Sequence, residues 1–116
     1  LHNAKRARTP IINVVGDHAT AHLQYDAPLT SDVKGVAQPM SDWVRTSVSA
    51  SDLAKAGVEA VEQAHVYPGK IATIIAPADH AWTDGADAVS RINRAAAPTV
   101  SGLSASHRSS RGMAPS

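Results

Sequence analysis

The chain contains no cysteine and no phenylalanine, and two tryptophans and two tyrosines are its whole aromatic content. Without cysteine, neither a disulfide framework nor a thiolate zinc site can form. No run of about 18 apolar residues occurs, so we expect no membrane contact through a spanning segment. The basic start, residues 1–8, lacks the apolar stretch and cleavage site of a signal peptide. We therefore predict a cytoplasmic protein.

Length and charge place the chain among ordinary soluble domains. It has 116 residues, 43% of them hydrophobic, and a net charge of +1. The basic clusters at 5–8 and 91–111 are small and lack interleaved aromatic residues, so nucleic-acid binding is not expected. The sequence begins with Leu1 instead of methionine, and we expect it to start inside a longer reading frame.

Three short apolar segments have the composition of β-strands. Ile11–Val15 and Ile71–Ile75 are continuous apolar runs, which favour strands buried on both faces of a parallel sheet. Trp43–Val48 is more polar and is expected nearer a sheet edge. The segment from His18 to Asp32 has no periodicity and is predicted to be a long loop. A weak helical turn is expected at 33–38, stopped by Pro39.

Two helices are indicated as well. Residues 1–8 are interpreted as the last turns of one helix, and residues 52–65 carry one apolar stripe of small side chains. The alternation of helix and strand predicts an α/β fold with a partial parallel sheet of three strands over residues 1–82. Residues 83–116 are low in complexity and are predicted to form a disordered tail, with a weak helical pattern at 86–96. Trp82 is interpreted as a cap on the last strand.

A metal site is the first chemical possibility in the predicted loop. His18 and His22 are four residues apart, and Asp17 and Asp26 could complete a ligand set. However, a zinc peptidase motif requires glutamate directly after the first histidine, and Ala19 stands there. We therefore interpret both histidines as loop residues and predict no metal site.

Four motifs follow one another along the chain. They are RTPIINVVGD at residues 8–17, a D…P…W segment at residues 32–43, the helical pattern at residues 51–65 and a strand pattern at residues 68–79. Their order resembles the pyrimidine-binding domain of thiamine-diphosphate enzymes of the acetolactate synthase and benzoylformate decarboxylase type. In that resemblance, residues 8–17 are similar to the strand midway through the domain, residues 32–43 to the family's D…P…KW segment, residues 51–65 to its last helix and residues 68–79 to the strand that closes it. Residues 16–32 are also similar to the loop of acetolactate-synthase-like proteins.

The resemblance implies a flavodoxin-like domain with a six-stranded parallel sheet, of which this chain holds the last three strands, the C-terminal half. In that family the final strand inserts between the other two. Ile71–Ile75 is therefore expected between Ile11–Val15 and Trp43–Val48.

The same resemblance implies that the catalytic groups lie elsewhere. The family's catalytic glutamate belongs to the other half of the domain, and Glu59 and Glu62, the only glutamates here, match nothing catalytic. The family's magnesium and diphosphate anchor, a GDG run followed by an asparagine pair, has no counterpart in the chain. Thiamine diphosphate and magnesium are accordingly expected in the intact parent, and no productive binding is expected from this chain.

A cofactor- or substrate-facing loop is the site that the resemblance does assign. It places Asp17, His18, Leu29 and Thr30 at the domain edge that faces the cofactor and the partner subunit. Acetolactate synthases usually carry glutamine where Leu29 and Thr30 stand, and this departure bears on the parent's substrate.

We therefore predict an inactive fragment of an enzyme that forms or cleaves carbon–carbon bonds in 2-keto acids. Its expected partners are the missing domains or a homologous subunit, and the exposed edge of Ile11–Val15 predicts self-association. One alternative is a stand-alone α/β module with a binding or regulatory role. Another is a nucleotide-binding domain, which requires a glycine-rich loop after the first strand, where only Gly16 occurs.

Overall fold

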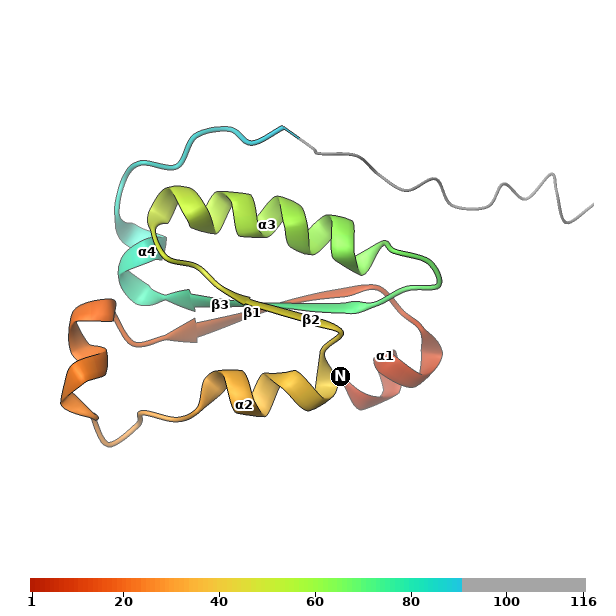
Figure 1. Cartoon of the computed structure of the whole chain (residues 1–116), viewed down its shortest axis with the longest axis horizontal. Helices are drawn as coiled ribbons and strands as arrows, with labels where there is room; N and C mark the ends of the chain where they lie inside the picture. Colours follow the sequence, from red (N-terminus) through yellow and green to blue (C-terminus); the bar gives the residue numbers. More distant parts are fainter. Residues whose placement is uncertain (91–116) are drawn as a thin grey trace, which may run out of the picture.

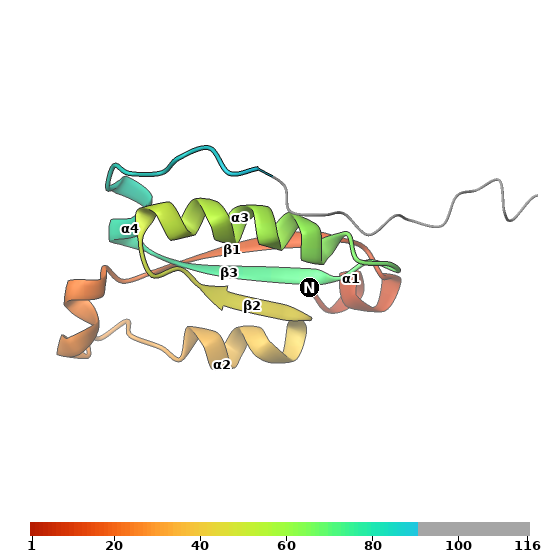
Figure 2. The same cartoon turned by 45° about the horizontal axis from the view of Figure 1, so that its top comes forward.

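Three parallel strands form the centre of the fold, which a computed structural model describes for residues 1–90. They are β1 (Ile11–Asp17), β2 (Trp43–Thr46) and β3 (Ile71–Pro77). Their order is β1-β3-β2, so the last strand lies between the other two (Figure 2). The α/β class and the central position of the last strand are both confirmed. The predicted tail lies outside the described residues from residue 91 on, and residues 83–90 form neither helix nor strand.

β3 is the buried centre of the sheet. All of its residues are buried, and its register pairs Ile71 with Ile11 and Ala72 with Trp43. Backbone hydrogen bonds continue the ladder at both ends, where the amide of Ile11 donates to the carbonyl of Lys70 and that of Ser47 to the carbonyl of Ile75. The apolar run therefore predicts this strand correctly.

The prediction that β1 is buried on both faces of the sheet is wrong. Its residues alternate between half-buried and exposed, and the side chains of Ile12 and Val14 are 41% and 63% exposed. The register places these two beside Ala72 and Ile74, on the sheet face that carries the long helix. Because that helix packs mainly over β3, the edge strand remains uncovered on this face.

The long helix, α3 (Ala50–Ala64), lies across one face of the sheet (Figure 1). Ser49 caps its first turn, with the Ser49 hydroxyl oxygen accepting a hydrogen bond from the amide of Asp52. Fully buried alanines face the strands, with Trp43 and Leu53 packed beside them; these alanines are Ala56, Ala60 and Ala64. Alanine has the smallest side chain that still favours a helix, so α3 can approach β3 closely.

The opposite face carries short helices (Figure 1): α1 (His2–Ala7), α2 (Val33–Ala37) and the 3-10 turn η2 (Gln38–Met40). Asp32 caps α2 by accepting a hydrogen bond from the amide of Gly35. The helical turn predicted at 33–38 is confirmed as α2, which ends at Ala37 before Pro39. The chain then continues into η2 instead of a loop, because Pro39 occupies the first turn of that 3-10 helix, where its missing amide costs no hydrogen bond. No helix within residues 1–90 is long and apolar enough to cross a membrane.

Two short helical segments lie where the strands end. The predicted loop after β1 contains the 3-10 helix η1 (Thr20–Tyr25), and β3 runs directly into α4 (Ala78–Trp82). Neither segment was expected from the sequence. Trp82 ends α4 with 73% of its surface exposed, so its interpretation as a cap on β3 is wrong.

Candidate functional site

The carboxyl ends of β1 and β3 meet at one edge of the sheet. Asp17 pairs in register with Pro77, so the segments that follow the two strands start side by side. Figure 1 shows η1 and α4 at this end of the sheet and α1 at the other. Open parallel sheets bind ligands outside the carboxyl ends of their strands, which makes this edge the place to look for a site.

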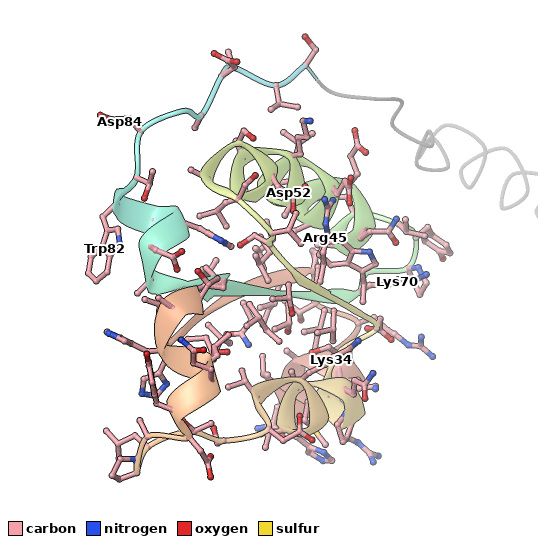
Figure 3. The ribbon with its side chains drawn as sticks, turned by 60° about the vertical axis from the view of Figure 1, so that its left-hand side comes forward. Lys34, Arg45, Asp52, Lys70, Trp82 and Asp84 are labelled. Atoms are coloured by element: carbon pink, nitrogen blue, oxygen red, sulfur yellow. The ribbon has the colours of Figure 1, made fainter. Side chains whose placement is uncertain are left out.

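A cavity of about 450 Å³ opens at this edge. It brings together three of the four residues predicted for the cofactor- or substrate-facing loop: Asp17, His18 and Leu29. Trp82, which no motif indicated, forms part of the same wall, and Figure 3 shows its ring pointing outward from α4. The remaining lining residues are Gly16, Ala19, His22, Ser31, Val33 and Ala78.

Asp17 and His18 form a local pair inside the cavity. The Oδ1 atom of Asp17 accepts a hydrogen bond of 2.8 Å from the backbone amide of His18. The Nδ1 atom of the same histidine lies 3.7 Å from that oxygen. This arrangement fixes the carboxylate against its own chain, so one of its oxygens is already engaged.

Leu29 and Thr30 differ in their surroundings. Leu29 is 83% exposed and lines the cavity, so it presents an apolar surface at this edge. Thr30 is not among the lining residues. Its amide donates to the carbonyl of Ala27, and its hydroxyl is buried without a hydrogen-bond partner in the described part of the chain. The predicted substrate-facing role of both residues stays a prediction.

Thr20 and Asp79 join η1 to α4. The amide and the hydroxyl of Thr20 donate to the two carboxylate oxygens of Asp79, at 2.9 and 2.6 Å. These hydrogen bonds hold the pKa of Asp79 below its usual value, because they stabilise the charged carboxylate. These two hydrogen bonds hold together the two segments beside the cavity, and no sequence motif indicated them.

Ser47 and His80 form a second contact beneath the same edge. The Ser47 hydroxyl lies 2.9 Å from Nδ1 of His80, and the two residues are only 2% and 8% exposed. Nε2 of the histidine lies 3.8 Å from Asp79. The residue types are those of a hydrolase triad, but a serine this deeply buried cannot reach a substrate. The contact therefore anchors α4 to the end of β2.

Metal-binding groups do not gather at this edge within residues 1–90, where no set of three or more His, Cys, Asp and Glu side chains lies close enough to hold an ion. His22 joins His18 in the cavity wall, whereas Asp26 is not a lining residue. Glu59 forms an ion pair with Arg45 of β2, which also pairs with Asp52 (Figure 3). The side chain of Glu59 is 42% exposed, so this ion pair lies at the surface of the molecule.

The amino edge of the sheet has the opposite electrostatic character. A pocket of about 440 Å³ there is lined by basic groups of α1 and the turn after it, with Met40, Asp42 and Gly69: the basic residues are His2, Lys5, Arg6 and Arg8. Asp42 is the one acidic residue among them, and its carboxylate accepts a hydrogen bond from the amide of Ile71. Cations therefore gather at one end of the strands and Asp17 and Asp79 at the other.

Comparison with known proteins gives one relative. A Mycobacterium tuberculosis (strain ATCC 25618 / H37Rv) protein, "Putative acetolactate synthase large subunit IlvX", is 51% identical over 100 residues. The match covers 84% of this chain and 19% of that protein, so the chain spans about a fifth of its relative's length. No family model matches the chain, and no solved structure does. The chain is thus homologous to part of an acetolactate synthase-like protein.

Proposed function

We propose that the chain is the C-terminal half of the pyrimidine-binding domain of a thiamine-diphosphate-dependent enzyme that acts on 2-keto acids, and that it is inactive alone. The strand order β1-β3-β2 carries the proposal, because it is the order that this domain type requires of its last three strands. The 51% identity to an acetolactate synthase-like protein supports it independently. In the intact parent the reaction is the formation or cleavage of a carbon–carbon bond.

The residues of the carboxyl-edge cavity do not fit the cofactor. Thiamine diphosphate requires a carboxylate at its aminopyrimidine ring and oxygen ligands for the magnesium ion that neutralises its phosphates. The cavity's carboxylate is Asp17, which is held by the amide of His18. Glu59 is not among the lining residues of the cavity and forms an ion pair with Arg45. We therefore assign the cofactor and its metal to other parts of the parent.

The role left to this chain is structural and substrate-facing. Leu29 and Trp82 are 83% and 73% exposed at the rim of the cavity, which favours their being covered in an assembly. The covering partner that we propose is a missing domain of the parent or a homologous subunit. Asp17 and His18 would then lie at that interface.

The coding region upstream of Leu1 tests the family assignment. We expect the reading frame to continue into further strand–helix units, one of which ends in the family's glutamate. A frame that opens at this chain, with a start codon and no such units before it, would overturn the fragment assignment.

A second candidate is a stand-alone binding module, favoured by the size of the cavity, which lies within the usual range of about 300–1,000 Å³ for small-molecule sites. Because Trp82 lines it, its fluorescence reports on occupancy. Titration with pyruvate as the probe distinguishes the candidates. A saturable change that Trp82→Leu abolishes supports the module, and an unchanged spectrum favours the fragment.

A further inference from the structure

Basic side chains surround the pocket at the amino edge of the sheet, here called the amino-edge pocket. Its volume is about 440 Å³, and Lys5, Arg6 and Arg8 line it together with His2, Met40, Asp42 and Gly69. Within residues 1–90, none of these lysine and arginine side chains forms an ion pair. Nζ of Lys5 donates one hydrogen bond, of 3.1 Å, to the carbonyl of Pro39, which leaves its other hydrogens available.

The carboxylate in the wall does not neutralise these cations. Oδ2 of Asp42 accepts a hydrogen bond of 2.9 Å from the amide of Ile71, and among the described residues Asp42 forms no ion pair. Three lysine and arginine side chains against one carboxylate leave two positive charges in excess. Like charges around one cavity repel one another, and an anion placed between them removes that repulsion.

Helix capping does not account for the whole cluster. Cations are common near a helix C-terminus, because they interact favourably with its free carbonyls. Here the carbonyls of Ala4 and Lys5 already accept hydrogen bonds from the amides of Thr9 and Arg8. Arg8 itself lies one residue beyond α1, with a left-handed φ of 57°. The chain therefore adds a cation to the pocket where the helix has ended.

The amino-edge pocket keeps its walls whatever precedes Leu1. Met40, Asp42 and Gly69 form its second wall, next to the starts of β2 and β3, so it lies on the inner side of β1. Leu1 lines a different groove, which extends to residues 15 and 16 near the carboxyl end of β1. Figure 1 likewise shows α1 running from the N-terminus toward the amino edge. A longer chain would thus leave α1 at the end remote from the pocket.

We propose that the amino-edge pocket binds a phosphate group through Lys5, Arg6 and Arg8. Each guanidinium presents a planar fork of N–H donors that matches phosphate oxygens, and the lysine ammonium adds a point charge. A phosphate monoester carries roughly two negative charges near neutral pH, which equals the excess in the pocket. The ligand is either free phosphate or the phosphoryl group of a small molecule. The site is independent of the proposed function, because none of its residues lines the carboxyl-edge cavity.

An NMR titration of the ¹⁵N-labelled full chain with inorganic phosphate tests the site. Sodium chloride keeps the ionic strength constant, so that screening does not change during the titration. We expect saturable shifts of the amides of residues 5–9 and 40–42, with a dissociation constant on the order of 1 mM, because exposed cations bind anions weakly. Acetate, with a single charge, is the comparison. The absence of saturable shifts with phosphate, or equal shifts with acetate, would overturn the proposal.

Charge-removing variants locate the bound phosphate. Arg6→Gln and Arg8→Gln each remove one guanidinium, and we expect the phosphate dissociation constant to rise at least about threefold. Lys55→Gln is the matched control, because Lys55 is exposed on α3, which covers the other face of the sheet from α1. Arg6 is an exposed residue within α1, so Arg6→Gln carries the test even if Arg8→Gln alters the turn. Equal weakening by Lys55→Gln would show a diffuse charge effect and contradict the site.

A variant of the opposite sign separates binding from stability. Asp42→Asn removes the negative charge of the wall and keeps a side-chain oxygen that can accept from the amide of Ile71. We expect phosphate to bind about twofold or more tightly, because the anion then meets less repulsion. Unchanged or weaker binding by Asp42→Asn would contradict the proposal.

The source of the phosphate is distinguished with glycerol 3-phosphate as a second probe. Tighter binding than that of inorganic phosphate supports a site for a phosphorylated small molecule, since the rest of the ligand then contacts the pocket. Equal affinity supports a site for free phosphate. Failure of both probes to compete with each other for the same amides would overturn the single site that we propose.

Discussion

The contact between Ser47 and His80 is the residue-level link that holds α4 to the sheet. Ser47→Ala leaves Nδ1 of His80 buried without its partner, so we expect the free energy of unfolding to fall by about 1–3 kcal/mol in urea denaturation. Ser90→Ala, at an exposed position outside any helix or strand, is the control and is expected to change it by less than about 0.5 kcal/mol. If Ser47→Ala and Ser90→Ala lowered the free energy of unfolding equally, the hydrogen bond between Ser47 and His80 would contribute nothing to stability.

The hydrogen bonds from Thr20 lower the pKa of Asp79. Thr20→Val removes the hydroxyl donor, the largest cause of the lowered pKa, and we expect the pKa of Asp79 to rise toward 3.8 in a carboxylate NMR titration. A lowered folded-state pKa contributes stability that is present above the unfolded value and is lost as the pH falls through the folded value. The free energies of unfolding of the wild type and of Thr20→Val should therefore differ at neutral pH and become equal in strong acid. An unmoved pKa would contradict this account.

At the scale of elements, replacing either of two glycines by alanine is expected to change the free energy of unfolding in opposite directions. Gly57 lies inside α3 with nothing within 4 Å of an added Cβ atom, so Gly57→Ala is expected to raise the free energy of unfolding by about 0.5–1 kcal/mol. Gly69 has φ +126°, and an added Cβ would lie 2.0 Å from the carbonyl oxygen of Arg8. Gly69→Ala is therefore expected to lower it by more than about 1 kcal/mol. Thermal or urea unfolding of both variants checks the pair, and a shared sign would contradict the geometry.

The elements that the sequence predicts are those with a local signal. α3 has an apolar stripe and a cap at Ser49, and its predicted start at residue 52 lies two residues after its observed start at Ala50. β3 is a continuous apolar run between turn residues, and its predicted start at Ile71 is the observed one. The exposure of β1 could not be predicted, because an edge strand and a central strand have the same apolar composition here. What differs is the position of α3 above β3, which is a property of the assembled fold.

The candidate site was predicted only in part, because some of its contacts also arise only in the assembled fold. Asp17, His18 and Leu29 were assigned through a family resemblance, and the cavity does bring them together. Trp82 and the contact of Thr20 with Asp79 depend on the register of Asp17 with Pro77, which joins segments far apart in sequence. Pro77 followed by Asp79 is a helix-start pattern that could have indicated α4.

At the scale of the whole molecule, the sheet has a covered side and ends of opposite charge. Its described part carries no group of metal ligands and no glutamate in the carboxyl-edge cavity. The function that we propose assigns the chemistry of the parent to segments beyond this chain and gives the chain a supporting and docking role.

Calorimetric titration of the full chain with thiamine diphosphate and magnesium chloride tests this central claim most directly. The sample must first show a cooperative unfolding transition, so that an absence of heat reflects a folded protein. We predict no saturable heat up to about 1 mM cofactor, the concentration scale of a binding free energy of about −4 kcal/mol. A saturable isotherm with a defined stoichiometry would contradict the assignment of this chain as a supporting, non-catalytic half-domain.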